Sequence, residues 1–422
     1  MGLTKSKAVD NNIFNNLPEK IYEFNDENIG LQSYIVIDTL NGGSSCGGLR
    51  ISSNLTLDEL KILAKIMTIK YSFLKRKTGG AKAGIILPKD CSSEQKTKIL
   101  EAFGQKASEL LRKGLYVPWT DMNSNIDDIS LIMRSAGCKY NNISDSSYFT
   151  ALTVVSSIKA ACEIKNIDMS KTTVSIEGFG NVGTNIANEL KRYGMKIIGI
   201  STLNGTLYDN SGLDVDKLID IRKKYQDELV KHYPANYYDK TEPLLEMETD
   251  ILVPCAGIYS INNLNMNKIR TKMIIPGANA PLTREAELFL HNKGILYIPG
   301  FISNIGGVFG TSLYDNNIPI KKVYNFIMKE YGFLIKNLIW SSFRNNCLPS
   351  KIAYEVAMKN FNGYNNSRNN NNSYNKKYLR HFLQIGLNTP RYIPLFRPYM
   401  TLLNQKIILN SNIKSIIRIH NF

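Results

Sequence analysis

Two lysines in the first quarter of the chain have surroundings that suit chemistry on a small charged ligand. Lys82 lies in the glycine-rich stretch Thr78-Gly-Gly-Ala-Lys-Ala-Gly84, which we interpret as a turn. Its glycines would let the backbone pass close to a ligand and leave one ammonium to reach it. A desolvated lysine can also lose its proton near neutral pH. On this stretch alone, a surface hairpin with a solvated lysine is the simpler interpretation.

Lys70 favours the interpretation as a ligand site, because it lies on the apolar side of a predicted helix. Apolar residues recur at helical spacing over residues 57–74, and Lys70 continues their inward row four residues after Ile66. An inward ammonium needs a partner, which a bound carboxylate would supply. The alternative is a lysine that snorkels at the edge of the helix.

Asp121 is a third candidate, since it directly follows a short predicted strand at residues 116–119. A carboxylate at a strand end often carries chemistry in an α/β domain. Aspartate at such a place also caps turns, and taken alone Asp121 would more often be structural.

A second candidate site begins at Gly178-Phe-Gly180-Asn-Val-Gly183. This stretch follows a β-rich run at Thr173–Glu177 and precedes a predicted helix that ends near Tyr193 and a strand at 196–201. In such a βαβ unit the glycines permit a tight turn and close approach of a pyrophosphate. The pattern predicts a dinucleotide-binding domain, and a glycine-rich turn without nucleotide is the minor alternative.

The residues after the second strand of that unit leave the choice of dinucleotide open. Ser201-Thr202-Leu203-Asn204 contains no acid to read the adenosine ribose, so strict NAD preference is not supported. No Arg or Lys occurs from Ser201 to Leu207, so strict NADP preference is not supported either. We therefore expect NAD or NADP.

These sites require two α/β domains, as the length of 422 residues also suggests. Residues 1–145 are expected to form a substrate-binding and catalytic domain, and residues 146–330 a doubly wound Rossmann domain. Residues 331–362 are expected to form helices that return to the first domain. The predicted elements of the first domain are an N-terminal helix, strands at 33–38 and 83–87, and helices at 57–74 and 92–113. In the second, strands at 251–254, 272–275 and 295–298 extend a parallel sheet.

The net charge of +16 does not by itself indicate a nucleic-acid partner. Nine of the basic residues lie beyond Asn362, where no acidic residue occurs. This part opens with an Asn-rich stretch at 365–375, which is typical of low-complexity sequence. We expect residues 363–422 to form a poorly ordered basic extension, with RNA contact as the distant alternative.

Other features of the composition indicate a cytoplasmic protein. The six cysteines form no CxxC pair and histidine is scarce, which argues against a metal site or a disulfide scaffold. No apolar run approaches membrane-spanning length, and residues 1–16 lack the apolar core of a secretory signal. We expect no metal, no membrane and no nucleic acid among the partners.

Taken in order, the motifs resemble the glutamate/leucine/phenylalanine/valine dehydrogenase family over residues 29–361, closest in pattern to glutamate dehydrogenase. The matching stretches are Gly47-Gly-Leu-Arg50, Met67-Thr-Ile-Lys70, Gly79-Gly-Ala-Lys82, Asp121 after a strand, Gly178-Phe-Gly-Asn-Val-Gly183, Pro254-Cys-Ala256, Gly277-Ala-Asn279 and Asn304-Ile-Gly-Gly-Val308. The resemblance implies a homo-oligomeric oxidoreductase for reversible NAD(P)-dependent oxidative deamination. Its substrates would be an L-amino acid and the matching 2-oxo acid.

The resemblance also implies roles for single residues. Lys70 would grip the substrate α-carboxylate, Lys82 would stabilise the attacking water and the carbinolamine, and Asp121 would move the amine proton. Cys46, Gly79, Gly80 and Thr311 would line the substrate pocket. The implied cofactor-binding residues are Thr150, Gly178, Gly180, Asn181, Val182, Gly183, Thr202, Ala256, Asn279 and Asn304.

Departures from the family pattern keep a second interpretation open. Cys46 stands where glutamate-specific members carry a lysine for the distal carboxylate, so glutamate would lose a bond worth roughly 1.5–3 kcal/mol. Ala151 and Thr153 replace preferred glycines near the nicotinamide, where added side chains could crowd the cofactor. The alternative to an active dehydrogenase is a weakened paralogue that acts as a binding or regulatory subunit.

Overall fold

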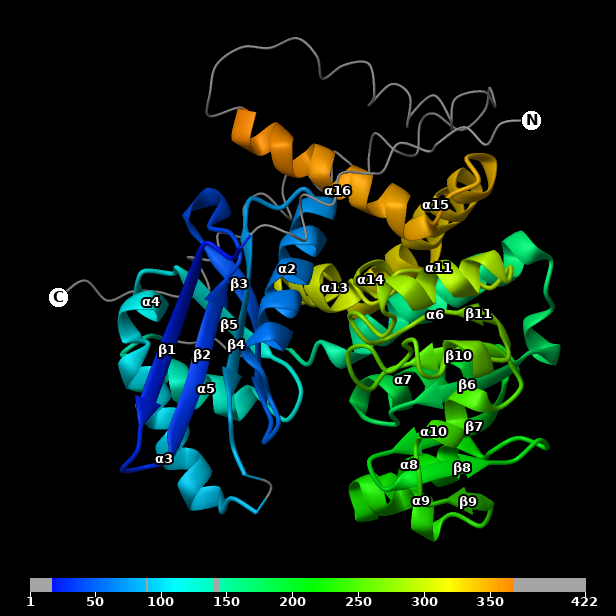
Figure 1. The fold of residues 1–422 in the computed structure, drawn as a ribbon, viewed down its shortest axis with the longest axis horizontal. Coiled ribbons are helices and arrows are strands. Elements are labelled where there is room, and N and C mark those ends of the chain that lie inside the picture. Colours follow the sequence, from blue (N-terminus) through cyan, green and yellow to red (C-terminus); the bar gives the residue numbers. More distant parts are fainter. Residues whose placement is uncertain (1–16, 89, 140–143, 367–422) are drawn as a thin grey trace. The chain divides into compact units, whose positions relative to one another are not determined.

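The computed structural model describes residues 17–88, 90–139 and 144–366, and Figure 1 shows their helices and strands. The described chain divides into two compact units. Unit 1 comprises residues 17–72 and 77–139, and unit 2 comprises residues 73–76 and 144–366. The predicted basic extension lies outside the described residues except for 363–366, which end helix α16 (Pro349–Asn366).

Unit 1 is built on a five-stranded sheet with the order β1-β2-β4-β3-β5. Strands β1 and β2 pair antiparallel, β2 and β4 also pair antiparallel, and β3 lies parallel between β4 and β5. The strand bounds are β1 Lys20–Asp26, β2 Leu31–Ile37, β3 Ser45–Ile51, β4 Gly79–Ile85 and β5 Tyr116–Thr120. Every residue of β3 and β4 is buried, so these two strands form the centre of the unit.

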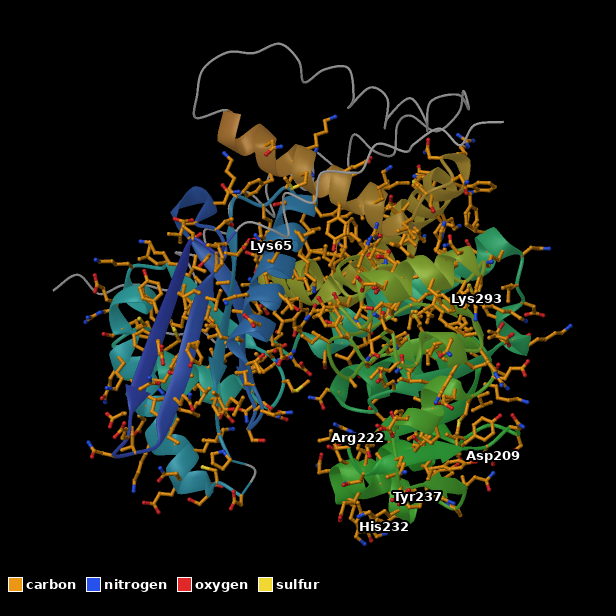
Figure 2. The ribbon with its side chains drawn as sticks, viewed as in Figure 1. Lys65, Asp209, Arg222, His232, Tyr237 and Lys293 are labelled. Carbon is orange, nitrogen blue, oxygen red and sulfur yellow. The ribbon has the colours of Figure 1, made fainter. Side chains whose placement is uncertain are left out.

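Helix α2 (Leu57–Phe73) packs directly on this sheet, where the helical periodicity predicted it. A Cβ built on Gly80 would lie 2.1 Å from the backbone N of Thr68. Polar bonds add to this contact, since Thr68 Oγ1 donates to Asp38 Oδ2 at 2.6 Å and Lys65 Nζ lies 2.7 Å from Asp38 Oδ1. Lys65 is labelled on this helix in Figure 2. The helix is therefore fixed to the sheet along the turns that precede Lys70.

The stretch around Lys82 is a central strand, so its prediction as a turn is wrong. It belongs to β4, which begins at Gly79, four residues before the predicted strand. A Cβ on Gly79 would lie 1.7 Å from the carbonyl O of Thr39, which shows that glycine here permits close packing. Glycines used for close packing and glycines used to reverse the chain look alike in a sequence.

Residues 20–26 form an edge strand that the sequence analysis did not predict. Strand β1 pairs with β2 along its whole length, from Lys20 opposite Ile37 to Asp26 opposite Leu31. Alternate residues such as Tyr22 and Phe24 are half-buried, and the residues next to them, such as Glu23 and Asn25, are exposed. The expected N-terminal helix is wrong for this part, and residues 1–16 lie outside the described ones.

Of the remaining helices of unit 1, α3 (Ser93–Lys106) and α4 (Ser108–Arg112) lie where one helix over 92–113 was predicted, whereas α5 (Ile126–Ser135) was not predicted. Ser92 caps α3, since its side chain accepts a hydrogen bond from the backbone N of Gln95 at 3.1 Å. Helix α5 packs closely against α3, because a Cβ on Gly104 would lie 2.4 Å from the carbonyl O of Ile132.

Unit 2 contains the predicted parallel sheet. Its strand order is β12-β11-β10-β6-β7-β8-β9, and the first five strands are parallel. Strands β8 and β9, which were not predicted, add an antiparallel edge. The bounds are β6 Thr173–Glu177, β7 Lys196–Thr202, β8 Gly205–Tyr208, β9 Asn236–Tyr238, β10 Thr249–Pro254, β11 Thr271–Ile274 and β12 Leu296–Tyr297. The α/β fold class is thus confirmed.

Helices surround this sheet. Helix α6 (Ser147–Lys165) is almost wholly buried, and α7 (Asn181–Lys191) follows the glycine-rich stretch. The others are α8 Val215–Tyr225, α9 Leu229–His232, α10 Glu242–Glu246, α11 Arg284–Asn292, α12 Gly300–Ser303, α13 Gly306–Asp315, α14 Ile320–Phe326, α15 Gly332–Arg344 and α16 Pro349–Asn366. None of the helices in the described ranges is both long and apolar enough to cross a membrane.

Gly80→Ala should destabilise the chain, because the added methyl group would meet backbone atoms of α2 that have no room to move. We expect a loss of about 1–3 kcal/mol, the usual cost of overpacking, measured as a lower urea midpoint. Gly257→Ala is the matched control, since a Cβ there meets nothing within 4 Å. Equal midpoints for the two variants would contradict the packing described for α2.

Candidate active site

The carboxylate of Asp121 lies at the centre of a buried charge cluster in unit 1. Lys82 Nζ is 2.8 Å from Asp121 Oδ2, and Arg50 Nε is 2.7 Å from the same oxygen. Arg50 also forms an ion pair with Glu59, in the first turn of α2. Neighbouring parallel strands supply the partners, because Arg50 lies on β3, Lys82 on β4, and Asp121 directly after β5.

The two glycines before Arg50 make room for this cluster. A Cβ on Gly48 would lie 2.7 Å from the Cβ of Asp121 and 3.3 Å from Lys82 Nζ. A Cβ on Gly47 would lie 1.6 Å from the carbonyl O of Ala81. The spacing Gly-Gly-x-Arg therefore has a physical reason: small residues admit the carboxylate and ammonium, and Arg50 reaches the same carboxylate from two residues beyond Gly48.

The charges of the cluster hold Asp121 ionised. Burial alone would raise the pKa of this carboxyl, but Arg50 and Lys82 outweigh it and hold the pKa well below its ordinary range. Burial lowers the pKa of Lys82, although the charge of Asp121 opposes this. Asp121 is thus a carboxylate throughout the neutral range and can accept a proton.

Lys70 completes the group of predicted charges. Its side chain is 5% exposed, which confirms the prediction that it faces inward. Burial and, to a lesser degree, the charge of Lys82 lower the pKa of Lys70 to about 7, although the charge of Asp121 opposes both. A carboxylate bound beside this ammonium would supply an opposite charge and favour its protonated form.

Arg50 and Glu59 are the residues of this cluster that sequence reasoning missed. Arg50 belongs to a motif that the resemblance used, but nothing in the sequence shows that it reaches Asp121, 71 residues away. Glu59 looks like an ordinary acid in the first turn of a helix. Only their positions in space show that they orient the carboxylate.

Cys46, Gly79 and Gly80 also lie in the core of unit 1. Cys46 pairs in register with Gly80 on one side and Val117 on the other, and its side chain is buried. It precedes Gly48 by two residues, so both residues face the same side of β3. Any ligand group next to Cys46 would therefore meet an uncharged thiol.

In unit 2 the glycine-rich stretch forms the connection from β6 to α7. Gly178 has φ +85°, and a Cβ there would lie 2.9 Å from the backbone N of Ala256. A Cβ on Gly183 would lie 2.3 Å from the carbonyl O of Gly178, whereas beside Gly180 nothing lies within 4 Å. The stretch thus combines a tight turn with open space at Gly180, ahead of the α7 N-terminus formed by Asn181 and Val182.

Two asparagines meet beyond the ends of the strands of this sheet. Asn304 Nδ2 donates to the carbonyl O of Gly277 at 2.8 Å and to Asn279 Oδ1 at 3.0 Å. The other amide atom, Asn304 Oδ1, is buried and accepts no hydrogen bond from the described residues. A buried acceptor without a donor is costly, so this oxygen is suited to an amide N–H of a ligand. The cofactor-binding residues predicted here therefore fit a dinucleotide.

Thr150, Thr202 and Thr311 are the remaining predicted site residues of unit 2. Thr150 Oγ1 donates to the carbonyl O of Ser146 at 2.8 Å, and Thr202 Oγ1 donates to the carbonyl O of Asp227 at 2.6 Å. Thr311 is fully buried on α13, and its hydroxyl has no hydrogen-bond partner among the described residues.

Comparison with known proteins shows what the two units belong to. Residues 143–315 match a family model described as Glutamate/Leucine/Phenylalanine/Valine dehydrogenase, and residues 18–138 match one described as Glu/Leu/Phe/Val dehydrogenase, dimerisation domain. The glutamate dehydrogenase of Thermotoga maritima is 30% identical over 350 residues, which are 77% of this chain and 81% of the relative. The chain belongs to the glutamate/leucine/phenylalanine/valine dehydrogenase family.

Other similar proteins are also glutamate dehydrogenases. The NADP-specific glutamate dehydrogenase of Saccharolobus shibatae is 32% identical over 283 residues, 63% of this chain and 66% of the relative. NAD-specific glutamate dehydrogenases of Staphylococcus aureus match as well, so NAD or NADP fits the chain. The crystal structure of hetero-hexameric glutamate dehydrogenase from Thermus thermophilus (Leu bound form) shares the fold. Its TM-score is 0.73 at 19% identity, over 84% of this chain and 91% of that one.

Ala151 and Thr153, two departures from the family pattern, pack inside unit 2. Ala151 and Thr153 are both fully buried on α6. Thr153 Oγ1 donates to the carbonyl O of Thr150 at 3.0 Å and accepts from the backbone N of Gly306 at 3.1 Å. Because these side chains fill contacts between α6 and its neighbours, the expected crowding of the cofactor has no support in this geometry.

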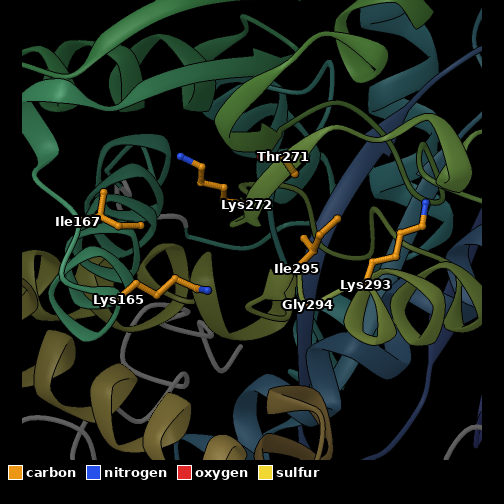
Figure 3. Close-up of a pocket in the computed structure, with 7 residues that line it drawn as sticks. All are labelled: Lys165, Ile167, Thr271, Lys272, Lys293, Gly294 and Ile295. Atoms are coloured by element: carbon orange, nitrogen blue, oxygen red, sulfur yellow. The ribbon is translucent and has the colours of Figure 1, made fainter.

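Unit 2 also has a cavity of about 370 Å³, and none of the predicted site residues lines it. Its lining includes Lys165, Lys272 and Lys293, but Figure 3 shows that the three ammonium groups do not converge. Lys272 is also paired with Asp250 at 2.6 Å. Among the described residues, no group of three or more His, Cys, Asp or Glu side chains could hold a metal ion.

Arg50→Gln should raise the pKa of Asp121, because it removes one of the two cations on Oδ2. The loss of a charge-assisted bond of roughly 1.5–3 kcal/mol corresponds to about 1–2 pH units. Asp121 must be ionised to accept a proton, so the acid limb of the activity profile should move to higher pH in this variant. The measurement is the acid limb of the kcat/KM profile with an amino acid substrate.

Two further variants control this experiment. Arg50→Lys keeps a cation and should shift the acid limb less than Arg50→Gln does. Lys61→Gln removes a partly exposed cation of α2 that is paired with Asp58, and it should leave the limb in place. An unshifted limb in Arg50→Gln would contradict the assignment of Arg50 as the residue that positions and ionises Asp121.

Proposed function

We propose that the chain catalyses the reversible NAD(P)-dependent oxidative deamination of an L-amino acid to its 2-oxo acid and ammonia. The observation that carries the proposal is that two buried lysines, Lys70 and Lys82, act electrostatically on each other and on the carboxylate of Asp121, in a member of an amino acid dehydrogenase family. This cluster contains an ammonium suited to a substrate carboxylate, a second ammonium, and a carboxylate kept ionised.

The free oxygen of Asp121 defines the proton transfer. Oδ2 carries both Arg50 and Lys82, so Oδ1 is the oxygen that we assign to the substrate amine. It takes a proton from the amine during oxidation and returns one to ammonia at the end. Because Asp121 stays ionised at neutral pH, this base is ready before the substrate arrives.

The two lysines have separate tasks in this proposal. Lys70 holds the α-carboxylate, for which its buried ammonium offers a charge-assisted bond. Lys82 orients the water that attacks the imine carbon and stabilises the negative charge that develops on the carbinolamine oxygen. Because burial lowers the pKa of Lys82, its neutral amine can take up the proton that the attacking water loses, and in the reverse direction its ammonium donates that proton to the carbinolamine oxygen.

Residues of unit 2 would hold the dinucleotide, which accepts the hydride of the α-carbon when it is bound. Gly178, Gly180 and Gly183 provide the turn and the open space for the pyrophosphate. Asn304 Oδ1 would accept a hydrogen bond from the carboxamide of the nicotinamide, which would satisfy a buried oxygen that no described residue satisfies.

Several finer features belong to the same proposal. Cys46 favours a substrate side chain without a distal carboxylate, because a thiol offers that carboxylate no positive charge. We place the protein in the cytoplasm as a homo-oligomer, and the name of the matched dimerisation domain supports association. No observation on the described residues favours the alternative of a regulatory subunit.

A substrate panel tests the proposed function. Purified protein is assayed for reduction of NAD and of NADP with glutamate, leucine, valine and phenylalanine. We expect turnover with at least one of the apolar amino acids, exceeding that with glutamate. A folded protein that reduces neither dinucleotide with any amino acid would end the proposal.

Lys82→Ala should abolish turnover and leave dinucleotide affinity nearly unchanged, because Lys82 belongs to unit 1 and the glycine-rich stretch to unit 2. The measurements are the initial rate and the dissociation constant of NADPH or NADH by fluorescence. A parallel loss of dinucleotide binding would contradict the assignment of Lys82 to the substrate.

Cys46→Lys should improve the use of glutamate, because it supplies a cation for the distal carboxylate. A gain of about tenfold or more in kcat/KM for glutamate is expected, with a loss for leucine. Cys46→Ser, which stays uncharged, is the control. If Cys46→Lys leaves the ratio of the two substrates unchanged, Cys46 does not face the substrate side chain.

A further inference from the structure

Arg222 lies against the glycine-rich stretch, although it is far from it in the sequence. It occupies the last turn of α8 and is labelled in Figure 2. Its Nε donates to the carbonyl O of Phe179 at 2.9 Å, and its Nη2 donates to Asn181 Oδ1 at 3.0 Å. Both acceptors belong to the stretch that would bind the pyrophosphate.

The residues after α8 reach the carboxyl end of β7. Thr202, the last residue of β7, donates from its hydroxyl to the carbonyl O of Asp227. The backbone N of Phe179 donates to the carbonyl O of Ser201 at 2.7 Å, so the glycine-rich stretch meets the same strand end. In dinucleotide-binding domains this strand end lies beside the adenosine ribose. Arg222 is therefore a cation in the neighbourhood of that ribose.

The chemistry of Arg222 suits an anion better than a ribose hydroxyl. Its guanidinium carries five N–H groups, of which two make the bonds to Phe179 and Asn181. Across the described ranges, no carboxylate lies within ion-pair distance of it. Half-buried guanidinium groups with unused donors are suited to bind phosphate through paired hydrogen bonds.

We propose that Arg222 binds the 2′-phosphate of NADP, so that the chain prefers NADP to NAD. This inference rests on the proposed function, since it assumes that unit 2 binds a dinucleotide. It narrows the expectation of NAD or NADP, for which only the residues from Ser201 to Leu207 were considered. Arg222, the cation proposed to bind the ribose phosphate, lies on α8. It is distant in sequence from the end of β7, and the fold brings the two together.

One neighbouring group opposes this assignment. Asp227 lies close enough for its charge to act on Arg222, and a carboxylate there could accept hydrogen bonds from the ribose hydroxyls of NAD. Its observed contact with β7 is made by its backbone carbonyl, whereas Arg222 directs its guanidinium at the glycine-rich stretch. The 2′-phosphate of NADP therefore matches the group that the structure orients.

Binding of two nucleotide fragments tests this inference without requiring turnover. Affinities of the full chain for 2′,5′-ADP and for 5′-AMP are measured by calorimetry. The unmodified chain should bind 2′,5′-ADP at least about tenfold more tightly. Arg222→Gln should remove that difference and change the affinity for 5′-AMP less than about twofold. Arg222→Lys should retain part of the difference, because it keeps the charge and loses the paired bonds.

Lys223→Gln is the matched control, since Lys223 is an exposed cation on the same helix, paired with Asp220 at 2.9 Å. It should behave like the unmodified chain. Equal affinities of the unmodified chain for the two fragments would overturn the proposal, as would an equal loss of both in Arg222→Gln. Preference for 2′,5′-ADP without turnover on any amino acid would uphold the role of Arg222 while the proposed function fails.

Discussion

One carboxylate oxygen that carries two buried cations is the interaction on which the active-site account depends. Such a group is costly to bury unless each charge has a partner in good geometry. The structure meets this condition with Arg50 and Lys82 on Oδ2 of Asp121, and with Glu59 as a further partner of Arg50. The glycine at 48 follows from the same requirement, because a Cβ there would meet Asp121 and Lys82, and the glycine at 47 lets β3 lie close to the backbone of β4. The arrangement leaves the second oxygen of Asp121 for a substrate.

Unit 2 solves a different problem, which is to bring backbone close to a large anionic cofactor. Its glycines at 178 and 183 pack against neighbouring backbone, and the space beside Gly180 stays open. Polar side chains of this unit are fixed by one another, as in the bonds between Asn304 and Asn279 and between Arg222 and Asn181. Asn304 Oδ1 is buried and accepts no hydrogen bond from the described residues, so it indicates where a donor group of a ligand would bind.

Local patterns predicted much of this structure, and long-range contacts account for what they missed. Helical periodicity located α2 and the inward side of Lys70, and the glycine spacing after Glu177 located the turn from β6 to α7. The glycines around Lys82 led to the wrong prediction of a turn at β4, because close packing under a helix and reversal of the chain both require glycine. The contacts of Arg50 with Asp121 and of Arg222 with Phe179 span 71 and 43 residues, and no local pattern encodes them.

The most direct test of the account is the initial rate of amino-acid-dependent dinucleotide reduction by Asp121→Asn. The amide keeps the shape of the side chain but cannot take a proton from the amine. We predict that turnover falls by several orders of magnitude with every amino acid that the unmodified chain oxidises, while dinucleotide binding is retained. Turnover close to that of the unmodified chain would show that the buried carboxylate has only a structural role.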